Sequence, residues 1–202
     1  MTVRTRLAPS PTGYIHIGNL RTALWDYFLA KKHGGQFVLR IEDTDQERLV
    51  DGAIASLLKT LDKFQITHDE GPFLKEDGTI EERGDVGPYV QSQRLDIYKT
   101  YADELVAKGF AYACFCTSER LEEMRAQQTA AKQTPKYDRR CLKLGAEEVS
   151  RRIAAGEAHV IRMKIPEGTS TFDDAIRGHI SFNNADVDDQ VIIKSNGFAS
   201  YH

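Results

Sequence analysis

The first 65 residues alternate between short strand-like runs and helical patterns of apolar positions. Val3 to Leu7 is short and partly apolar, and a loop with two prolines and a glycine (residues 8–13) follows it. The helix predicted next has apolar residues that recur every three or four positions: Leu20, Ala23, Leu24, Tyr27 and Phe28. Two glycines end this helix, and residues 36–42 predict a strand that ends on Glu42.

A second amphipathic helix is predicted after this strand. Thr44 and Glu47 have the spacing of a capping box, which indicates a helix start. Two strands joined by a helix must lie parallel, so the order strand–helix–strand–helix predicts an α/β fold with a doubly wound parallel sheet. Such sheets bind ligands at the carboxyl ends of their strands, where we expect residues 8–13, His16 and Glu42 to lie.

The pattern changes after about residue 106. Residues 71–87 are polar and glycine-rich, which predicts a surface excursion, and a third helix starts near Leu95 and stops at Gly109. The elements predicted beyond it are strands at 110–116, 159–165, 179–182 and 191–194 and helices at 118–131, capped by Ser118, and 146–155. We therefore expect a catalytic domain over residues 1–106, an inserted α+β domain over 107–195, and a return to the first domain over 196–202.

Composition and charge limit the class of protein. Of the 202 residues, 41% are hydrophobic and 28% charged, as in ordinary globular proteins. The chain has neither a secretory signal nor an apolar run of roughly 18 residues, so we expect a cytoplasmic protein without a membrane partner. The net charge of −3 argues against nucleic-acid binding by overall charge, but residues 132–143 form a basic segment. That segment is either a solvated loop or a local RNA contact.

The loop before the first helix carries the strongest chemical signal. Neither of the two common glycine-rich phosphate motifs is present. Instead, a Pro/Gly loop opens a helix at His16 and Gly18. A helix N-terminus suits a phosphate, a glycine allows a nucleoside to approach the backbone, and an imidazole can donate to a phosphate oxygen in the transition state. The alternative is that His16 only caps the helix.

Several motifs resemble those of the glutamyl-tRNA synthetases, a family of class I aminoacyl-tRNA synthetases. The first runs from Arg6 through Ala8-Pro9-Ser10-Pro11-Thr12-Gly13 to His16-Ile17-Gly18, with Asn19 where class I enzymes have a second histidine. The others are Arg40-Ile41-Glu42-Asp43-Thr44-Asp45, Asp69-Glu70-Gly71-Pro72, Tyr89-x-Gln91-Ser92-x-Arg94, Ala111-Tyr112-x-Cys114-Phe115-Cys116 and Ser200-Tyr201-His202. The resemblance spans nearly the whole chain. It implies an incomplete Rossmann-like catalytic domain with an inserted domain that binds the tRNA acceptor stem.

The resemblance also implies roles for individual residues. His16, Gly18 and Asn19 would be catalytic, and ATP would be bound by these three together with Ala8, Pro9, Thr12 and Gly13. Glutamate would be bound by Arg6, Ser10, Glu42 and Tyr201, with Arg6 on its side-chain carboxylate and Glu42 on its ammonium group. Contacts with tRNA-Glu would come from Thr44, Asp45, Lys136, Arg139 and Arg140.

The implied reaction joins L-glutamate to ATP and then to tRNA. The α-carboxylate of glutamate would attack the α-phosphate of ATP, with Mg²⁺ on the phosphates, and the terminal ribose of tRNA-Glu would then take the glutamyl group. The family's Lys-Met-Ser-Lys-Ser loop, which also holds ATP, is absent from this sequence. We therefore expect the N-terminal part of a monomeric enzyme, inactive by itself.

Three cysteines and a tyrosine are similar to the zinc pattern of some glutamyl enzymes and of glutamyl-queuosine tRNA synthetases. Cys114-x-Cys116 and Tyr137-x-x-x-Cys141 would supply three thiolates, with the phenol or a water as fourth ligand of a structural Zn²⁺. The alternative is three free thiols, as expected for cysteines in a cytosolic chain without disulfides. Bound zinc would order the basic segment 132–143 for the acceptor stem.

Other functions compete with this interpretation. A glutamyl-queuosine tRNA synthetase shares the catalytic core, but Thr12 and the segment from Glu70 to Pro72 favour the glutamyl enzyme. A glutaminyl enzyme usually has Pro-Glu-Pro-Asn where this chain has Pro9-Ser10-Pro11-Thr12. The remaining alternatives are a small nucleotidyltransferase without an RNA partner and a fragment that binds nucleotide without catalysis.

Overall fold

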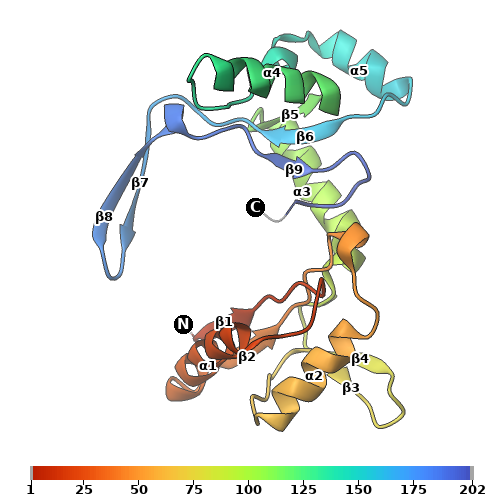
Figure 1. Ribbon diagram of the computed structural model, residues 1–202, viewed down its shortest axis with the longest axis vertical. Coiled ribbons are helices and arrows are strands. Elements are labelled where there is room, and N and C mark those ends of the chain that lie inside the picture. The colour runs from red at the N-terminus through yellow and green to blue at the C-terminus, as the bar shows by residue number, and fades with distance from the viewer. Residues whose placement is uncertain (1, 201–202) are drawn as a thin grey trace. The chain divides into compact units, whose positions relative to one another are not determined.

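The computed structural model describes residues 2–200, which form two compact units (Figure 1). The first unit extends to Leu95 and the second begins at Asp96. No helix in the described range is both long and apolar enough to cross a membrane.

A parallel pair of strands with a crossover helix forms the centre of the first unit. β1 (Arg4–Leu7) pairs with β2 (Gln36–Leu39) in parallel, with Arg6 opposite Val38. α1 (Ile17–Lys32) joins them, and Thr5 Oγ1 donates to the carbonyl of Asp26 on this helix at 2.7 Å. Parallel bridges from Val38 to Glu70 and from Ile41 to Val90 extend the pairing. The predicted parallel α/β arrangement is therefore confirmed.

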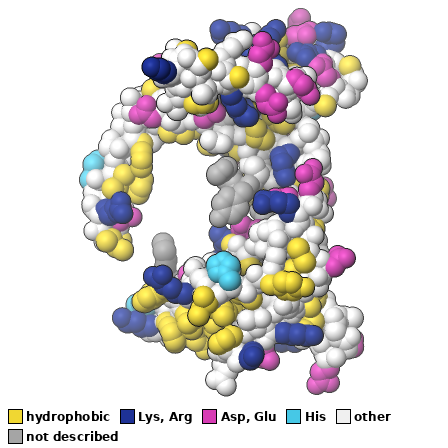
Figure 2. Space-filling model, in the orientation of Figure 1, with side chains coloured by type: hydrophobic (Ala, Val, Ile, Leu, Met, Phe, Trp, Pro, Cys, Tyr) yellow, Lys and Arg dark blue, Asp and Glu magenta, His cyan; other side chains and the backbone are white. Residues whose placement is uncertain are grey.

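The apolar face of α1 is narrower than its sequence pattern suggests. Ala23 and Ala30 are fully buried, whereas Trp25 and Phe28 are 69% and 59% exposed. Figure 2 shows apolar side chains gathered over this helix. The core beneath consists of side chains from β2 and α2 (Ala53–Lys63): Phe37, Leu39, Leu57, Leu58 and Leu61.

The expected capping box at Thr44 and Glu47 is wrong. Residues Gln46–Arg48 form a single 3-10 turn (η1) without a side-chain cap, and α2 begins at Ala53 after Gly52, whose φ is +74°. The backbone of this segment is used in tertiary hydrogen bonds instead. Glu42 N donates to Pro9 O at 2.9 Å and Val50 N donates to Pro11 O at 3.0 Å. The chain between β2 and α2 is thereby fixed to the loop that precedes α1.

The expected surface excursion at 71–87 contains an antiparallel hairpin. β3 (Gly71–Leu74) pairs with β4 (Ile80–Arg83), and η2 (Gln91–Arg94) follows. At Gly71, φ is +132° and a Cβ would lie 2.3 Å from the carbonyl oxygen of Leu39, so this position requires glycine. The hairpin was hidden in the sequence because β4 is mostly charged and solvent-facing.

The second unit is α+β, as expected. α3 (Leu95–Ala107) leads to a three-stranded antiparallel sheet in the order β5 (Ala111–Cys114), β6 (Val160–Met163), β9 (Val191–Ile193). Between β5 and β6 lie α4 (Ser118–Ala130), η3 (Arg140–Lys143) and α5 (Ala146–Ala154). The N-cap of α4 is Thr117 rather than Ser118, and its side chain accepts from Arg120 N.

A separate hairpin and a final turn complete the second unit. β7 (Thr169–Asp174) pairs with β8 (Gly178–Asn183), of which the sequence predicted residues 179–182, and η4 (Asn184–Asp186) follows. Residues 196–200, where we expected the return to the first domain to begin, belong to the second unit. Lys194 N donates to Phe198 O and Ser200 N to Ile192 O, so this segment doubles back on β9.

Candidate functional site

His16 caps α1, and its capping hydrogen bond determines which ring nitrogen is free to donate. Gly18 N donates to His16 Nδ1 at 3.1 Å, and His16 N donates to Asn19 Oδ1 at 3.2 Å, which forms a complete capping box. Because Nδ1 accepts a hydrogen bond, the neutral ring carries its proton on Nε2, which makes Nε2 a donor. His16 is exposed. Capping and donation to a ligand are therefore compatible in one side chain.

Gly18 and Asn19 both serve the orientation of His16. A Cβ at Gly18 would lie 2.8 Å from Cε1 of the imidazole, so the ring occupies space that any other residue would fill. Asn19 supplies the acceptor for the His16 backbone. An asparagine in this place, where class I enzymes have a second histidine, therefore has a defined structural role.

The loop before α1 encloses a small hollow. Its volume is about 60 Å³, and its lining includes Pro9, Ser10, Pro11 and Gly13 of the loop and Asn19 of α1. Ala8 and Thr12 are half-buried in the same loop. The predicted nucleotide-binding residues thus lie in this loop and the first turn of α1, and backbone hydrogen bonds to Pro9 and Pro11 connect the loop to Glu42 and Val50.

Arg6 and Glu42 meet at the carboxyl end of the parallel strands. Arg6 Nη1 lies 2.7 Å from Glu42 Oε1, and Arg40 Nη2 lies 2.8 Å from the same oxygen. Glu42 is buried, with 8% of its surface exposed, whereas the Arg6 side chain is 44% exposed. A buried carboxylate compensated by two guanidinium groups is a fixed, strongly polar anchor. The structure therefore joins two of the predicted glutamate-binding residues directly.

Arg40 and Arg4 are site neighbours that the sequence interpretation missed. In β1 and β2, alternate residues share a face, so Arg4, Arg6 and Arg40 lie on one face of the pair. They border a cavity of about 230 Å³. Arg4 binds Glu70, which also accepts from Tyr89 Oη at 2.6 Å, and this hydrogen bond and Arg4 lower the pKa of Glu70. The alternating arginines at positions 4 and 6 were the available signal.

The remaining predicted residues of the first unit are less central. Thr44 is buried, and Asp45 accepts from Arg48 Nε at 2.6 Å. Between Glu42 and Thr44, the side chain of Asp43 accepts from Ser92 N at 2.8 Å. Tyr201 lies outside the described residues.

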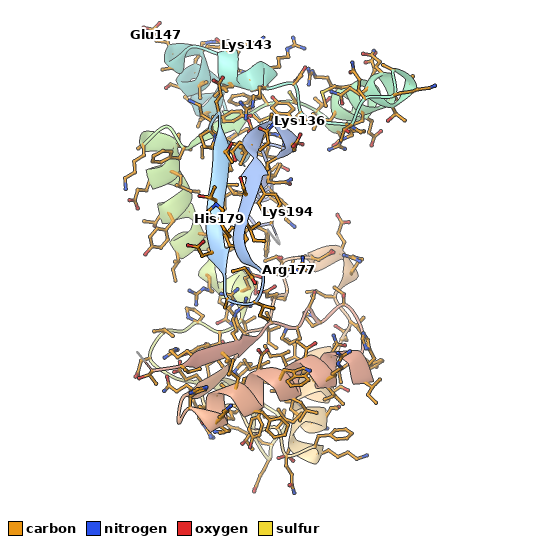
Figure 3. All side chains as sticks on the ribbon, turned by 90° about the vertical axis from the view of Figure 1, so that its left-hand side faces the viewer. Lys136, Lys143, Glu147, Arg177, His179 and Lys194 are labelled. Carbon is orange, nitrogen blue, oxygen red and sulfur yellow. The ribbon has the colours of Figure 1, made fainter. Side chains whose placement is uncertain are left out.

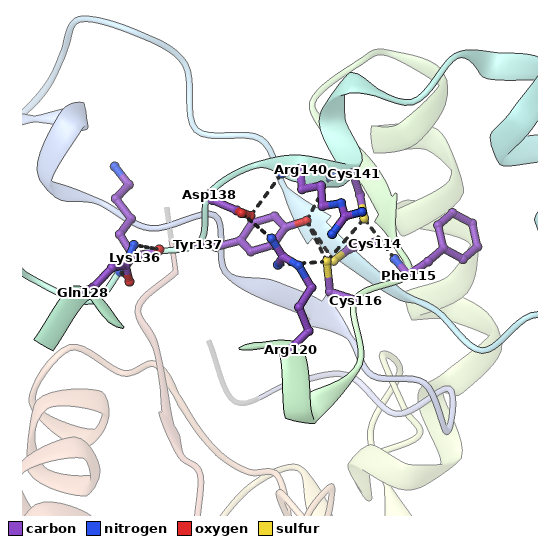
Figure 4. Close-up of polar contacts among 10 residues, drawn as sticks. All are labelled: Cys114, Phe115, Cys116, Arg120, Gln128, Lys136, Tyr137, Asp138, Arg140 and Cys141. Atoms are coloured by element: carbon purple, nitrogen blue, oxygen red, sulfur yellow. Dashed lines mark hydrogen bonds and ion pairs between the residues drawn. The ribbon is translucent and has the colours of Figure 1, made fainter. Parts of the chain in front are cut away.

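Three thiols and a phenol converge in the second unit (Figure 4). The sulfur atoms of Cys114, Cys116 and Cys141 lie within 4.8 Å of one another. Tyr137 Oη lies 3.2 Å from Cys114 Sγ and 3.4 Å from Cys116 Sγ, and it accepts from Cys141 N at 3.1 Å. All four predicted zinc ligands are therefore brought together by a strand end (β5), the loop before η3, and η3 itself.

The environment of this cluster shifts its titration. Burial raises the pKa of Cys116 to about 11, and burial together with the neighbouring thiols raises that of Tyr137. Burial alone would raise the pKa of Cys114, but its contacts with Tyr137 and Arg162 lower it. Phe115 N donates to Cys141 Sγ at 3.3 Å, as backbone amides do around metal-bound thiolates. The donor set and its spacing fit a tetrahedral zinc ion.

The basic segment 132–143 is less available than its sequence suggests. Arg139 Nη2 donates to Asp189 Oδ1 at 2.7 Å, and Asp189 is fully buried. Lys136 Nζ donates to the carbonyl of Ala185 at 2.6 Å, and Figure 3 shows Lys136 beside the base of the β7–β8 hairpin. Arg140, by contrast, is exposed. Two of the three predicted RNA-contacting cations, Lys136 and Arg139, therefore also form hydrogen bonds within the unit itself.

Comparisons with known proteins agree in family and fold. The family model described as tRNA synthetases class I (E and Q), catalytic domain, matches residues 2–202. The chain is 52% identical to the glutamate--tRNA ligase of Clostridioides difficile and 53% identical to that of Finegoldia magna. It spans 41% and 42% of the length of these relatives, with 100% and 99% of itself aligned.

Solved structures give the same result. A crystal structure of a glutamate tRNA ligase from Elizabethkingia meningosepticum in complex with its amino acid superposes with a TM-score of 0.88 at 38% identity. That alignment covers 100% of this chain and 40% of the other. A glutamate-tRNA synthetase from Elizabethkingia anophelis gives a TM-score of 0.87 at 37% identity. The fold is therefore the Rossmann-like fold of class I synthetases.

Substitution of the two adjacent arginines of the basic segment should affect stability to very different extents. Arg139→Gln removes one partner of a buried ion pair and should lower the unfolding free energy of the second unit by about 3 kcal/mol. Arg140→Gln, at an exposed position, should change it by less than about 0.5 kcal/mol. Hydrogen exchange of the β6 amides measures both. Equal protection in the two variants would contradict the structural role of Arg139.

Proposed function

Because the chain belongs to the class I tRNA synthetase (E and Q) catalytic-domain family, we propose that it is the N-terminal part of a glutamate–tRNA ligase. The observation that carries this proposal is the contact of Arg6 with Glu42 beside the loop that opens α1. It places a cation and an anion at the edge of a parallel sheet where this fold class binds ligands.

Glutamate would be recognised by separating these two charges. Its side-chain carboxylate would bind Arg6, whose planar guanidinium can hold both carboxylate oxygens. Its ammonium group would bind the buried carboxylate of Glu42. Arg6 is the more exposed partner and is therefore the one able to move. A neutral glutamine side chain would leave Arg6 without an anion, so the pair favours glutamate.

ATP would lie against the loop of residues 8–13 and the N-terminus of α1. The free N–H groups of a helix N-terminus attract phosphate, and His16 Nε2 supplies a further hydrogen-bond donor at that place. Mg²⁺ on the phosphates would neutralise their charge when ATP is bound. The residues of this chain would contribute position and hydrogen bonds rather than a covalent intermediate.

The reaction has two steps. An α-carboxylate oxygen of glutamate attacks the α-phosphorus of ATP, the bond to the β-phosphate oxygen breaks, and pyrophosphate leaves. A ribose hydroxyl at the 3′ end of tRNA-Glu then attacks the carbonyl of glutamyl-adenylate, and AMP leaves. The role of this chain is to hold the carboxylate and the phosphate in line. The contacts that we propose for the tRNA are Thr44, Asp45 and the exposed Arg140, together with Lys136.

The thiol cluster would hold a structural Zn²⁺. Cys114, Cys116, Cys141 and Tyr137 supply four donors within bonding reach of one ion. The metal would fix the turn after β5 to the start of η3, and hence the backbone beside Arg140. Its contribution would be to folding of the second unit, since it lies within that unit's own buried cluster.

Glutamate-dependent pyrophosphate exchange tests the proposed function. The full-length gene product should exchange pyrophosphate into ATP in the presence of tRNA and glutamate. Arg6→Ala should reduce this rate at least about hundredfold, because hydrogen bonds to charged groups contribute about 1.5–3 kcal/mol each. Arg83→Ala, which removes an exposed guanidinium of β4, is the control. Exchange that continues in Arg6→Ala, or that proceeds equally with glutamine, would refute the assignment.

Elemental analysis tests the zinc site. The chain purified from zinc-supplemented medium should contain close to one zinc per molecule, and Cys114→Ser should lose most of it because zinc prefers a complete thiolate set. Ser118→Ala, four residues away at the start of α4, should retain it. Metal-free wild-type protein would show that the cluster consists of free thiols.

A further inference from the structure

Two guanidinium groups share one oxygen of Glu42. Arg6 Nη1 and Arg40 Nη2 lie 2.7 Å and 2.8 Å from Oε1. They differ in freedom, since the Arg6 side chain is 44% exposed and the Arg40 side chain 27% exposed. Arg40 is also only two residues from Glu42 in the chain. Arg6 is therefore the more exposed partner of the carboxylate, and Arg40 is the less exposed one and the nearer in sequence.

The backbone around Arg40 is held on both sides. Arg40 N donates to Leu7 O at 3.1 Å, and Glu42 N donates to Pro9 O at 2.9 Å. Between them, Ile41 N donates to Tyr89 O, and the carbonyl oxygen of Ile41 accepts from Gln91 N, both at 2.9 Å. The distance between Arg40 and Glu42 is thus set by the extended backbone. It does not depend on the position of Arg6.

The guanidinium of Arg40 contacts Glu42 although one of its own buried donors is left without a hydrogen bond. Its Nε is buried and has no hydrogen-bond partner among the described residues. Unsatisfied buried donors are rare and carry a cost. The guanidinium is nevertheless oriented so that Nη2 contacts Glu42 while Nε stays unpaired. This indicates that the contact with the carboxylate determines the orientation of the side chain.

We propose that Arg40 is a positioning residue for the amino group of the substrate. This inference rests on the proposed function. When the side-chain carboxylate of glutamate draws Arg6 away, Arg40 keeps the carboxylate of Glu42 in place and electrostatically compensated. Glu42 then presents its other side to the substrate ammonium. One internal ion pair is exchanged for two with the substrate, and the buried carboxylate never loses its counter-charge.

Removal of Arg40 and removal of Arg6 should weaken the binding of different ligands. Arg6 contacts the substrate carboxylate, so its removal weakens every dicarboxylate. Arg40 acts through Glu42 on the ammonium group, so its removal weakens glutamate but not glutarate, which has the same two carboxylates and no amino group. A merely structural role for Arg40 would weaken both ligands alike.

The experiment measures pyrophosphate exchange by the full-length gene product with glutamate as substrate and glutarate as competitive inhibitor. Arg40→Gln should raise the KM for glutamate about tenfold or more, as expected for loss of a charge-assisted hydrogen bond, with kcat and the KM for ATP within about twofold. The inhibition constant of glutarate should stay within about twofold of the wild-type value. Arg40→Lys, which keeps the charge without the planar fork, should have an intermediate KM.

The control is Arg83→Gln, because Arg83 also pairs with a glutamate two residues away on a strand, Glu81, but at an exposed hairpin. It should leave every constant unchanged. If Arg40→Gln fails to fold, Arg40→Lys decides the question by the same two constants. The inference is overturned if glutamate and glutarate weaken equally, or if neither changes. If the inference is overturned while Arg6→Ala still loses glutamate use, it fails alone and the proposed function stands. If Arg6→Ala stays active, the proposed function fails as well.

Discussion

The hydrogen bonds that fix Glu42 hold the functional edge of the first unit together. Its backbone N–H donates to the carbonyl of Pro9, and its carboxylate accepts from Arg6 and Arg40. The first bond connects the end of β2 to the loop before α1, and the contact with Arg6 connects it to β1. Because both are made by one residue, the loop before α1 and the proposed amino-acid pocket have a defined separation. Positioning of this kind is what an uncatalysed phosphoryl transfer lacks.

The hydrogen bonds of Glu42 also explain why some predictions from the sequence were right and others wrong. The strand–helix–strand order follows from local patterns and from parallel topology, which also brings Arg6 and Glu42 to one edge of the sheet. Their direct contact was not predicted, and the cap by His16 was only the alternative to a role in phosphate binding. The capping box at Thr44 and Glu47 failed because it considered the segment in isolation. In the structure, the N–H groups of Glu42 and Val50 bond to the loop before α1, and the helix starts later. Arg40 was missed because its role depends on a side-chain contact, which spacing does not reveal.

The second unit also depends on one buried polar residue, Asp189. Its partner Arg139 belongs to the basic segment 132–143, which in the sequence suggests an exposed surface. Asp189 is fully buried and accepts from Tyr112 Oη at 2.7 Å, from Arg139 and from Ile165 N. Arg139 therefore stabilises the fold, and the basic segment presents fewer free cations than its composition suggests. The thiol cluster, by contrast, was found from its similarity to a family zinc pattern, and the structure brings its three cysteines and Tyr137 together.

In the proposed function, Arg6 and Glu42 separate to bind the two charged groups of glutamate. A crystal structure of the full-length gene product with a non-hydrolysable analogue of glutamyl-adenylate tests this separation directly. We expect the side-chain carboxylate of the ligand to lie within hydrogen-bond distance of Arg6 and its ammonium group to contact Glu42. The 2.7 Å contact between Arg6 and Glu42 should then be broken. A ligand whose carboxylate points elsewhere while that contact stays intact would contradict it.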